Sequence, residues 1–222
     1  PAPPPTASRA AMHALFDAVR EVESTMLTPA WGYTDPAEVA EAERAIAHIL
    51  WTGLSFWLEA DPNRPVFQRY VTPTRKLLGC NPDSVYYFAP IRDDRRYRIT
   101  GNVAAATFTS LTIERGSAQG HAARGSSAAI SDAEMEIAPD GSYEITVSRE
   151  KPARGNWLQL TDGASQITTR HYHESRHCVG TLPDGTVPIA IEALDPGPLA
   201  PYGGDARTAE RLRWIANFVR EH

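Results

Sequence analysis

The stretch at residues 169–174 concentrates more chemically capable side chains than any other part of this sequence: Thr-Arg-His-Tyr-His-Glu. Two imidazoles, a guanidinium, a phenol and a carboxylate fall within six residues. Imidazole and carboxylate groups can move protons at neutral pH, and imidazole also binds metals. We therefore take His171, His173 and Glu174 as the candidate catalytic residues.

A metal site is one interpretation of the same stretch. The run from His173 to His177 matches H-E-x-x-H, but that zinc motif needs a helix, and the strand-forming residues 166–169 lead into it. In an extended chain His171 and His173 project to one face and can reach one ion, with His177 or Glu174 completing the shell after a turn. The candidate metal ligands are His171, His173 and His177, and the candidate cofactor is a divalent transition metal. The alternative is a pair of histidines on a half-exposed strand.

Ligand binding is the second chemistry that the stretch suggests. Arg170 and Tyr172 share the other face of the strand with Glu174, and a guanidinium beside a phenol suits a carboxylate, a sulfate or sugar hydroxyls. The alternative is that Glu174 simply neutralises Arg170. Upstream, Asn156 and Trp157 follow a glycine. Trp157 can form a stacking wall for a ring-shaped ligand or anchor a strand in the core, and Asn156 can bond local backbone at a turn.

Three helices are expected to frame this region. Apolar residues at spacings of three and four predict an amphipathic helix over residues 8–27. Asp35 as a cap and Pro36 at the first position predict a second helix that ends at Asp61 and Pro62. A third helix is predicted over residues 205–220.

Between the helices the apolar pattern changes to alternation, which predicts strands. Asp140 and Gly141 lie between two such runs, a strong hairpin signal. The predicted strands cover residues 84–89, 95–100, 103–113, 134–138, 142–148, 166–174 and 186–192, with 84–89 and 95–100 as a hairpin and an exposed loop at 115–127. We expect an α+β fold: an antiparallel β-sandwich of jelly-roll type flanked by N-terminal helices and a C-terminal helix. The predicted division is 1–62 helical, 63–200 β-sandwich and 201–222 a helix that packs on it.

Composition narrows the classes of partner. The net charge of −5 gives no general attraction for phosphate backbones, and no apolar run reaches the roughly 18 residues that span a bilayer. We therefore expect no nucleic acid and no membrane as partners, but a small molecule and a homo-oligomer. Two cysteines make no disulfide framework, so a cytoplasmic location is expected, with export left open because the start of the chain can have been processed.

Several blocks in the β-rich part resemble a known family. In chain order they are residues 81–91, 97–102, 140–145, 155–158, 170–172 and 188–194. Together they resemble family 1214 of the domains of unknown function over roughly residues 75–195. The resemblance implies a β-sandwich of jelly-roll type, often found beside another uncharacterised domain, and it implies no established reaction. It also implies that His171 and His173 are particular to this chain.

Two functions follow from these observations as expectations. The first is an enzyme, a hydrolase or lyase, that acts on a small polar or sugar-like molecule by histidine and carboxylate acid-base chemistry with metal assistance. The second is a noncatalytic protein of small-ligand binding or assembly. The two functions are distinguished by which face of the strand at residues 169–174 lines a cavity.

Overall fold

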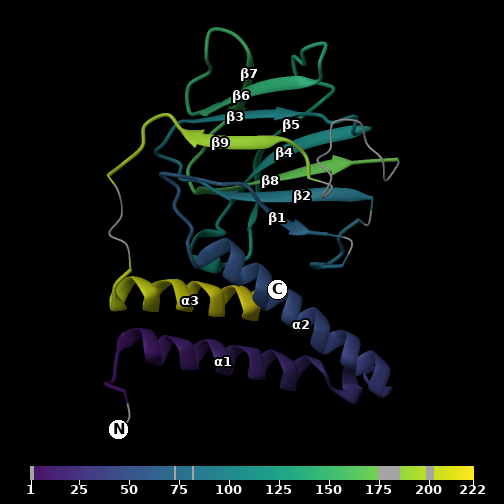
Figure 1. The fold of residues 1–222 in the computed structure, drawn as a ribbon, viewed down its shortest axis with the longest axis vertical. Helices are drawn as coiled ribbons and strands as arrows, with labels where there is room; N and C mark the ends of the chain where they lie inside the picture. The colour runs from purple at the N-terminus through teal and green to yellow at the C-terminus, as the bar shows by residue number, and fades with distance from the viewer. Residues whose placement is uncertain (1–2, 73, 82, 175–185, 199–202) are drawn as a thin grey trace.

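A computed structural model describes residues 3–72, 74–81, 83–174, 186–198 and 203–222 of the chain. In this part of the chain two β-sheets form one layered body, and three helices lie together below it (Figure 1). The predicted α+β class, with helices at both ends of the sequence, is confirmed. No helix in the described ranges combines the length and the hydropathy needed to cross a membrane.

Side-chain caps mark the starts of two helices, and the cap predicted at Asp35 is one of them. α1 (Ala7–Met26) follows Thr6, whose side chain accepts a hydrogen bond from the Arg9 backbone N–H. α2 (Pro36–Trp57) follows Asp35, whose carboxylate accepts from the Ala37 N–H at 2.8 Å. α3 (Asp205–Glu221) starts beside the first turn of α1, and the Asp205 carboxylate accepts from two backbone N–H groups of that turn. One carboxylate therefore satisfies the otherwise free donors at the start of a second helix.

The first sheet has five antiparallel strands in the order β1-β2-β8-β4-β5. Their bounds are β1 Gln68–Val71, β2 Ser84–Pro90, β4 Phe108–Arg115, β5 Gly125–Ser131 and β8 Ala164–Tyr172. β8 carries the histidine-rich stretch and lies in the middle of the sheet. Every backbone group of this strand therefore has a neighbour on both sides, and its side chains point either into the sandwich or toward the helices.

The second sheet has four strands in the order β7-β6-β3-β9. Their bounds are β3 Tyr97–Asn102, β6 Ser142–Ser148, β7 Asn156–Gln159 and β9 Ile189–Ala193. β6 and β7 run parallel, which departs from the antiparallel pairing expected throughout. The loop between them crosses from one end of the sheet to the other, so β7 re-enters in the same direction as β6.

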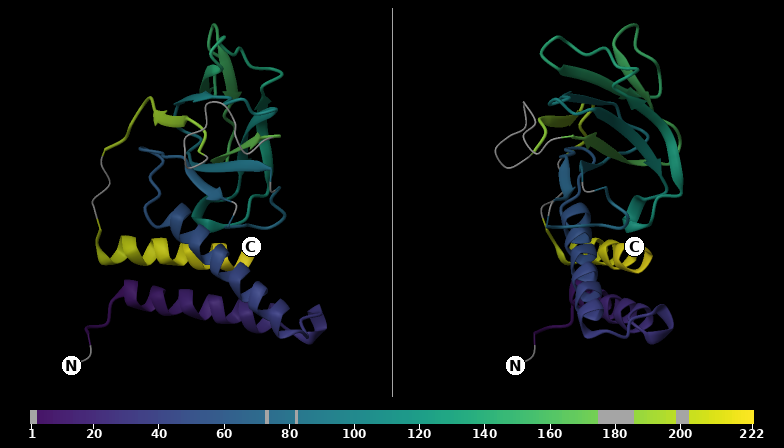
Figure 2. Two further views of the ribbon diagram at one scale, coloured as in Figure 1. Left: turned by 45° about the vertical axis from the view of Figure 1, so that its right-hand side comes forward. Right: turned by 90° about the vertical axis from the view of Figure 1, so that its right-hand side faces the viewer.

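Two large cores and a smaller cluster around Tyr87 hold the described part of the molecule together. The first lies between the sheets and includes Ile99, Leu111, Ile145 and Ile167, all fully buried. The second lies between the helices, and the sheet contributes Phe88 to it; the Phe88 ring stacks on Phe56 of α2 at 3.8 Å between centroids. The two side views show the helices grouped at one end of the sandwich (Figure 2). α3 contacts α1, α2 and the short 3₁₀ turn η2 (Ala118–Gly120).

Two predicted hairpins are wrong. β2 and β3 belong to different sheets, so the segment between them is a corner in which the Tyr97 hydroxyl accepts a hydrogen bond from the Arg92 N–H. Residues 134–138 form no strand, although the tight turn at Gly141 is present. Alternation of apolar residues reports local geometry, but it does not report which strand supplies the partner.

One strand begins later than predicted, and β5 was not predicted at all. The strand expected over residues 103–113 starts at Phe108, because Ala104 and Ala105 adopt left-handed backbone conformations that end extended structure. The expected exposed loop at 115–127 contains η2 and the first residues of β5.

Candidate functional site

β8 divides its side chains between two environments. Ile167, Thr169 and His171 point into the core between the sheets, where Ile167 and His171 are fully buried. Thr168 and Arg170 point to the opposite side, because Thr168 pairs across the strands with Phe88 of the helical core. The predicted split of the stretch by strand parity is thus the arrangement in the structure.

His171 is sealed in the core. Its Nε2 lies 3.1 Å from the Thr169 hydroxyl and its Nδ1 lies 3.4 Å from the Thr109 hydroxyl, so both nitrogens have a hydroxyl partner. The Tyr87 ring meets the imidazole edge to face at 6.0 Å. Burial, with the neighbouring His173 as a smaller cause, lowers the pKa of His171 from 6.5 to about 3. At neutral pH the ring is therefore uncharged and has no contact with solvent.

His173 lies just beyond the end of β8 and differs from His171. Its backbone N–H donates to the Asp83 carbonyl at 2.9 Å. Within the described ranges neither ring nitrogen has a hydrogen-bond partner. Burial, followed by the positive charge of Arg69, lowers the pKa of the His173 imidazole. Glu174 is exposed at the same end of the strand.

The metal interpretation finds no group of ligands in the described part of the chain. No three His, Cys, Asp or Glu side chains there come close enough to hold an ion. His177 lies outside the described residues, so the predicted set of His171, His173 and His177 remains a prediction. The two hydroxyl partners of His171 weigh against it, because a metal would have to displace one of them.

Arg170 lies in the middle of the helix-side surface of the five-stranded sheet. Tyr86 and Ser110 are its direct cross-strand neighbours, and its guanidinium carbon lies 6.0 Å from the centre of the Tyr86 ring. The side chain is half-buried. Among the described residues it forms neither a hydrogen bond nor an ion pair, and the expected alternative pair with Glu174 is not made. Tyr172, two residues along, packs its ring against Phe108 at 5.7 Å. We call Tyr86, Ser110, Arg170 and Tyr172 the Arg170 surface.

A polar network borders the Arg170 surface. The Glu114 carboxylate accepts hydrogen bonds from the Gln166 amide and, at 2.7 Å, from the Thr168 hydroxyl. Tyr70 on β1 is influenced by the charges of both Glu114 and Arg170. Burial and then Glu114 raise the pKa of Tyr70, while Arg170 acts in the opposite direction. Sequence reasoning missed Glu114 and Tyr70, because both lie far from β8 in the chain and no local motif marks them.

Asn156 and Trp157 lie on β7, at the edge of the other sheet. The Asn156 side chain accepts from the Glu136 N–H at 2.6 Å and donates to the Glu136 and Glu144 carbonyls at 2.9 and 3.0 Å. The Trp157 indole N–H donates to the Ser148 carbonyl and hydroxyl, both at 3.1 Å. The four predicted ligand-binding residues are therefore divided between two sheets. Asn156 bonds to backbone, but not to the local backbone of a turn as expected, because Glu136 and Glu144 lie 20 and 12 residues away in the sequence.

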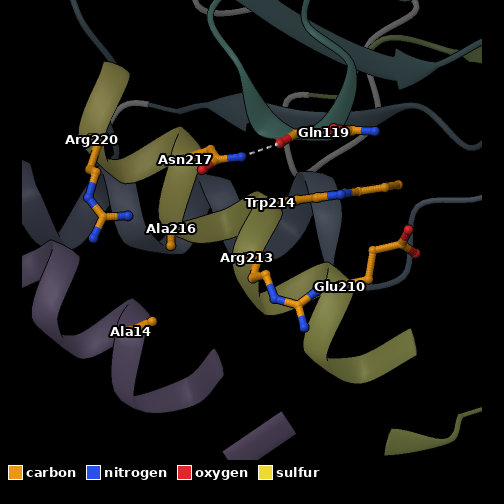
Figure 3. A pocket seen from close by; sticks show the side chains of 8 residues that line it. All are labelled: Ala14, Gln119, Glu210, Arg213, Trp214, Ala216, Asn217 and Arg220. Atoms are coloured by element: carbon orange, nitrogen blue, oxygen red, sulfur yellow. Dashed lines mark hydrogen bonds between the residues drawn. The ribbon is translucent and has the colours of Figure 1, made fainter. Parts of the chain in front are cut away.

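Two hollows open elsewhere on the described surface. One, of about 460 Å³, lies between α3, α1 and η2, where the Asn217 amide donates to the Gln119 carbonyl at 3.1 Å (Figure 3). Arg220 at its rim is engaged by Glu21. The other is a shallow groove of about 940 Å³ beside Asn156 and Gly101. Neither contains a residue of the histidine-rich stretch.

The middle of the chain matches a known protein family. Residues 89–176 match the family described as "Protein of unknown function (DUF1214)". These residues are a DUF1214 region. The predicted resemblance is confirmed, over a shorter stretch than the 75–195 expected. The DUF1214 region includes β3 to β8, and with them Asn156, Arg170 and His171, whereas all three α-helices lie outside it.

Solved structures extend the likeness beyond the DUF1214 region. A crystal structure of an uncharacterised protein from Burkholderia cenocepacia matches with a TM-score of 0.80 and 23% identity, covering 95% of this chain and 57% of that one. It shares the fold, helices included, and this chain spans little more than half its length. The VPA0106 protein from Vibrio parahaemolyticus matches with a TM-score of 0.30 and 17% identity over 59% of this chain and 31% of that one. This TM-score is too low to indicate a shared fold. No curated protein matches the chain.

Proposed function

We propose that this protein binds a small organic carboxylate through Arg170, without catalysis. The observation that carries the proposal is the uncommitted charge of Arg170. A half-buried guanidinium loses part of its hydration, and proteins normally offset that loss with a carboxylate or with carbonyl acceptors. In the described ranges Arg170 forms no hydrogen bond or ion pair with such an acceptor, and its guanidinium lies 6.0 Å from the centre of the Tyr86 ring. A bound anion supplies the acceptor.

The surroundings of Arg170 favour a carboxylate with an apolar or ring-shaped portion. The planar fork of a guanidinium matches the two oxygens of a carboxylate. Phe108 is 39% exposed beside Tyr172, so an apolar surface adjoins the charge. Ser110 adds a hydroxyl on the opposite side of Arg170 from Tyr86. A ligand that joins one carboxylate to a ring satisfies all three neighbours.

We prefer a noncatalytic function because His171, the strongest catalytic candidate, is fully buried. His171 has a pKa of about 3 and no solvent contact, so it neither takes up nor releases a proton near neutral pH. Glu174 is exposed and forms no pair with Arg170 among the described residues.

An enzyme remains the second candidate, on one specific observation. Both ring nitrogens of His173 are buried and lack hydrogen-bond partners in the described part of the chain, so this imidazole keeps a proton-transfer capacity that a substrate can use once it enters beside the ring. On this proposal a hydrolase or lyase reaction depends on His173, with Glu174 at the same strand end. A carboxylate that is bound but consumed over time, with His173→Ala abolishing consumption and not binding, distinguishes it from the first proposal.

Binding by Arg170 can be tested with three probes: benzoate, succinate and inorganic phosphate. We expect benzoate to bind with a millimolar dissociation constant in calorimetric titration and Arg170→Ala to weaken it by more than about tenfold, since one charge-assisted pair contributes roughly 1.5 to 3 kcal/mol. Arg170→Lys should recover only part of the affinity, because an ammonium cannot form the two parallel hydrogen bonds.

Arg98→Ala is the matched control, because this exposed arginine on the other sheet pairs with Glu192. It should leave benzoate binding unchanged. Equal affinities in wild type and Arg170→Ala, or no saturable binding of any probe, contradict the proposal. If phosphate binds and benzoate does not, the site binds a different class of anion from the carboxylate proposed.

A structural role for Arg170 predicts a different result. Since Arg170 makes no hydrogen bond or ion pair in the described ranges, we expect Arg170→Leu to unfold within a few degrees of wild type, or higher, because it removes an unpaired charge from a half-buried position. A large loss of melting temperature in the absence of ligand would instead show that the guanidinium supports the fold.

A further inference from the structure

One flank of α1 carries large apolar side chains that nothing in the described structure covers. The helix packs on α3 through Ala11, Leu15 and Ala18, which are buried. Met12 is 38% exposed, and Phe16 is 50% exposed, next to this buried face. Side chains four positions apart on a helix lie on the same side, so the two form one apolar stripe. Exposed apolar patches of this kind mark interaction surfaces.

Two charges on this side of α1 are spaced symmetrically about Phe16, whereas a third, Arg20, is paired with Asp17 on the same helix. Arg9 precedes Phe16 by seven residues and Glu23 follows it by seven, so all three lie on one side of the helix. Each charge lies about 10 Å from Phe16 along the axis. Both side chains are exposed, and neither forms an ion pair with any described residue.

We propose that two copies of this chain associate through α1 in antiparallel orientation, with Phe16 on the two-fold axis. An isologous contact uses the same surface twice, so that surface must complement itself. The antiparallel arrangement places Arg9 of each copy opposite Glu23 of the other, which makes two ion pairs on either side of a Phe16–Phe16 contact. A parallel pairing would place like charges opposite each other.

A second copy fits this stripe better than an anionic membrane does. α1 carries Arg9 and Arg20 against Asp17, Glu21 and Glu23, whereas helices that bind anionic lipid carry an excess of Lys and Arg. The stripe is also remote from the Arg170 surface, since α1 is the helix farthest from the sheets (Figure 1). The proposed dimer is therefore independent of the proposed ligand. It identifies the α1 stripe as the interface of the homo-oligomer expected from the sequence.

Charge exchange provides the decisive test. We expect the wild type to form a concentration-dependent dimer in sedimentation equilibrium. Arg9→Glu and Glu23→Arg should each raise the dimer dissociation constant, because each single change places like charges opposite each other twice. The double variant Arg9→Glu/Glu23→Arg should return the constant toward wild type, because both pairs are then restored with their signs reversed.

Two further variants examine the axis. Phe16→Glu should give a monomer with an unchanged far-ultraviolet circular dichroism spectrum, since Phe16 is half exposed and contributes little to the fold of one copy. Phe16→Cys, with Cys80 and Cys178 changed to Ser, should form an intermolecular disulfide under mild oxidation, because residues on a two-fold axis meet their own copies. Val66→Glu is the matched control: Val66 is 60% exposed and lies outside α1, and its variant should dimerise as wild type does.

The results that overturn the inference are equally specific. A wild type that is monomeric at every concentration overturns the proposed dimer. The apolar stripe would then be a surface for another segment, such as the additional part of the longer Burkholderia cenocepacia chain. A Phe16→Glu variant that stays dimeric moves the interface elsewhere. A double charge exchange that fails to restore association excludes the antiparallel register.

Discussion

Replacing His171 by Gln will remove a large part of the protein's sensitivity to mild acid. The folded protein holds the pKa of His171 at about 3, whereas an unfolded chain leaves a histidine near 6.5. Between these values the unfolded state binds a proton that the folded state refuses. The stability that this confers is complete above pH 6.5, and it is lost as the pH falls through this window toward 3.

The expected size follows from the width of the window. Between pH 6.5 and pH 4.5 the wild type should lose about 2 kcal/mol through His171 alone, because the slope rises from about half of 1.4 kcal/mol per pH unit at pH 6.5 to nearly the full value below it. Urea unfolding at a series of pH values measures this loss. His171→Gln keeps groups that can bond the Thr109 and Thr169 hydroxyls but cannot take up a proton, so its free energy of unfolding should change less over the same range.

His13→Gln is the control, because His13 is exposed on α1. Its stability should follow the wild-type pH dependence. A His171→Gln variant with the same pH dependence as wild type would mean that the folded protein accepts a proton at this position, and it would reopen a role for His171 in proton transfer.

Replacing Asn156 by Ala should cause the largest loss of stability at neutral pH among the predicted site residues. The side chain makes three hydrogen bonds to the backbone at Glu136 and Glu144. These bonds connect the segment before β6, which is not part of a strand, to the paired strands β6 and β7. Without the side chain, backbone groups at a buried position lose their partners, at about 1 kcal/mol or more each. We expect a total of about 3 kcal/mol, or a melting temperature lower by roughly 6 to 12 °C.

Thermal and urea unfolding of two companion variants sharpens this expectation. Asn156→Asp keeps an acceptor for the Glu136 N–H but directs a carboxylate at two carbonyl oxygens, so it should lose at least as much stability as Asn156→Ala. Gln159→Ala removes an exposed amide from the same strand and should change the melting temperature little. A small effect of Asn156→Ala would mean that water replaces the side chain at these backbone groups, and it would free Asn156 for a role in binding.

On these expectations the residues that look most reactive in the sequence, His171 and Asn156, are not the ones that bind a ligand. His171 and Asn156 are fully occupied inside the fold, one by threonine hydroxyls and the other by backbone. Arg170 is a less conspicuous residue, yet its charge is uncommitted among the described residues. A group whose hydrogen-bonding capacity is already satisfied has little left for a ligand, whereas an unsatisfied charge gains most from one.

Much of the fold could be read from local signals. Asp35 and Pro36 marked the start of α2 correctly, since a cap and a proline act within one turn of the helix. Alternation of apolar and polar residues identified β8 and separated His171 from Arg170, because successive side chains of any strand point to opposite faces. The family resemblance over the DUF1214 region was available from the same residues.

Pairing and burial depended on residues distant in sequence. Residues 134–138 have strand-like alternation, yet the backbone of Glu136 in their middle bonds to the Asn156 side chain, and the ends of the segment make turn hydrogen bonds to Ser131 and Ser142. Strand parity separated His171 from Arg170, but it could not say that the His171 face is the dry one. That outcome required the second sheet, which covers one face of β8 and removes water from it, and so lowers the pKa of the imidazole. The other face of the sheet contributes Phe88 to the helical core, and Arg170 on that face is half-buried. The chemistry available to each side chain is therefore set by what packs over it, and that packing comes from segments tens of residues away.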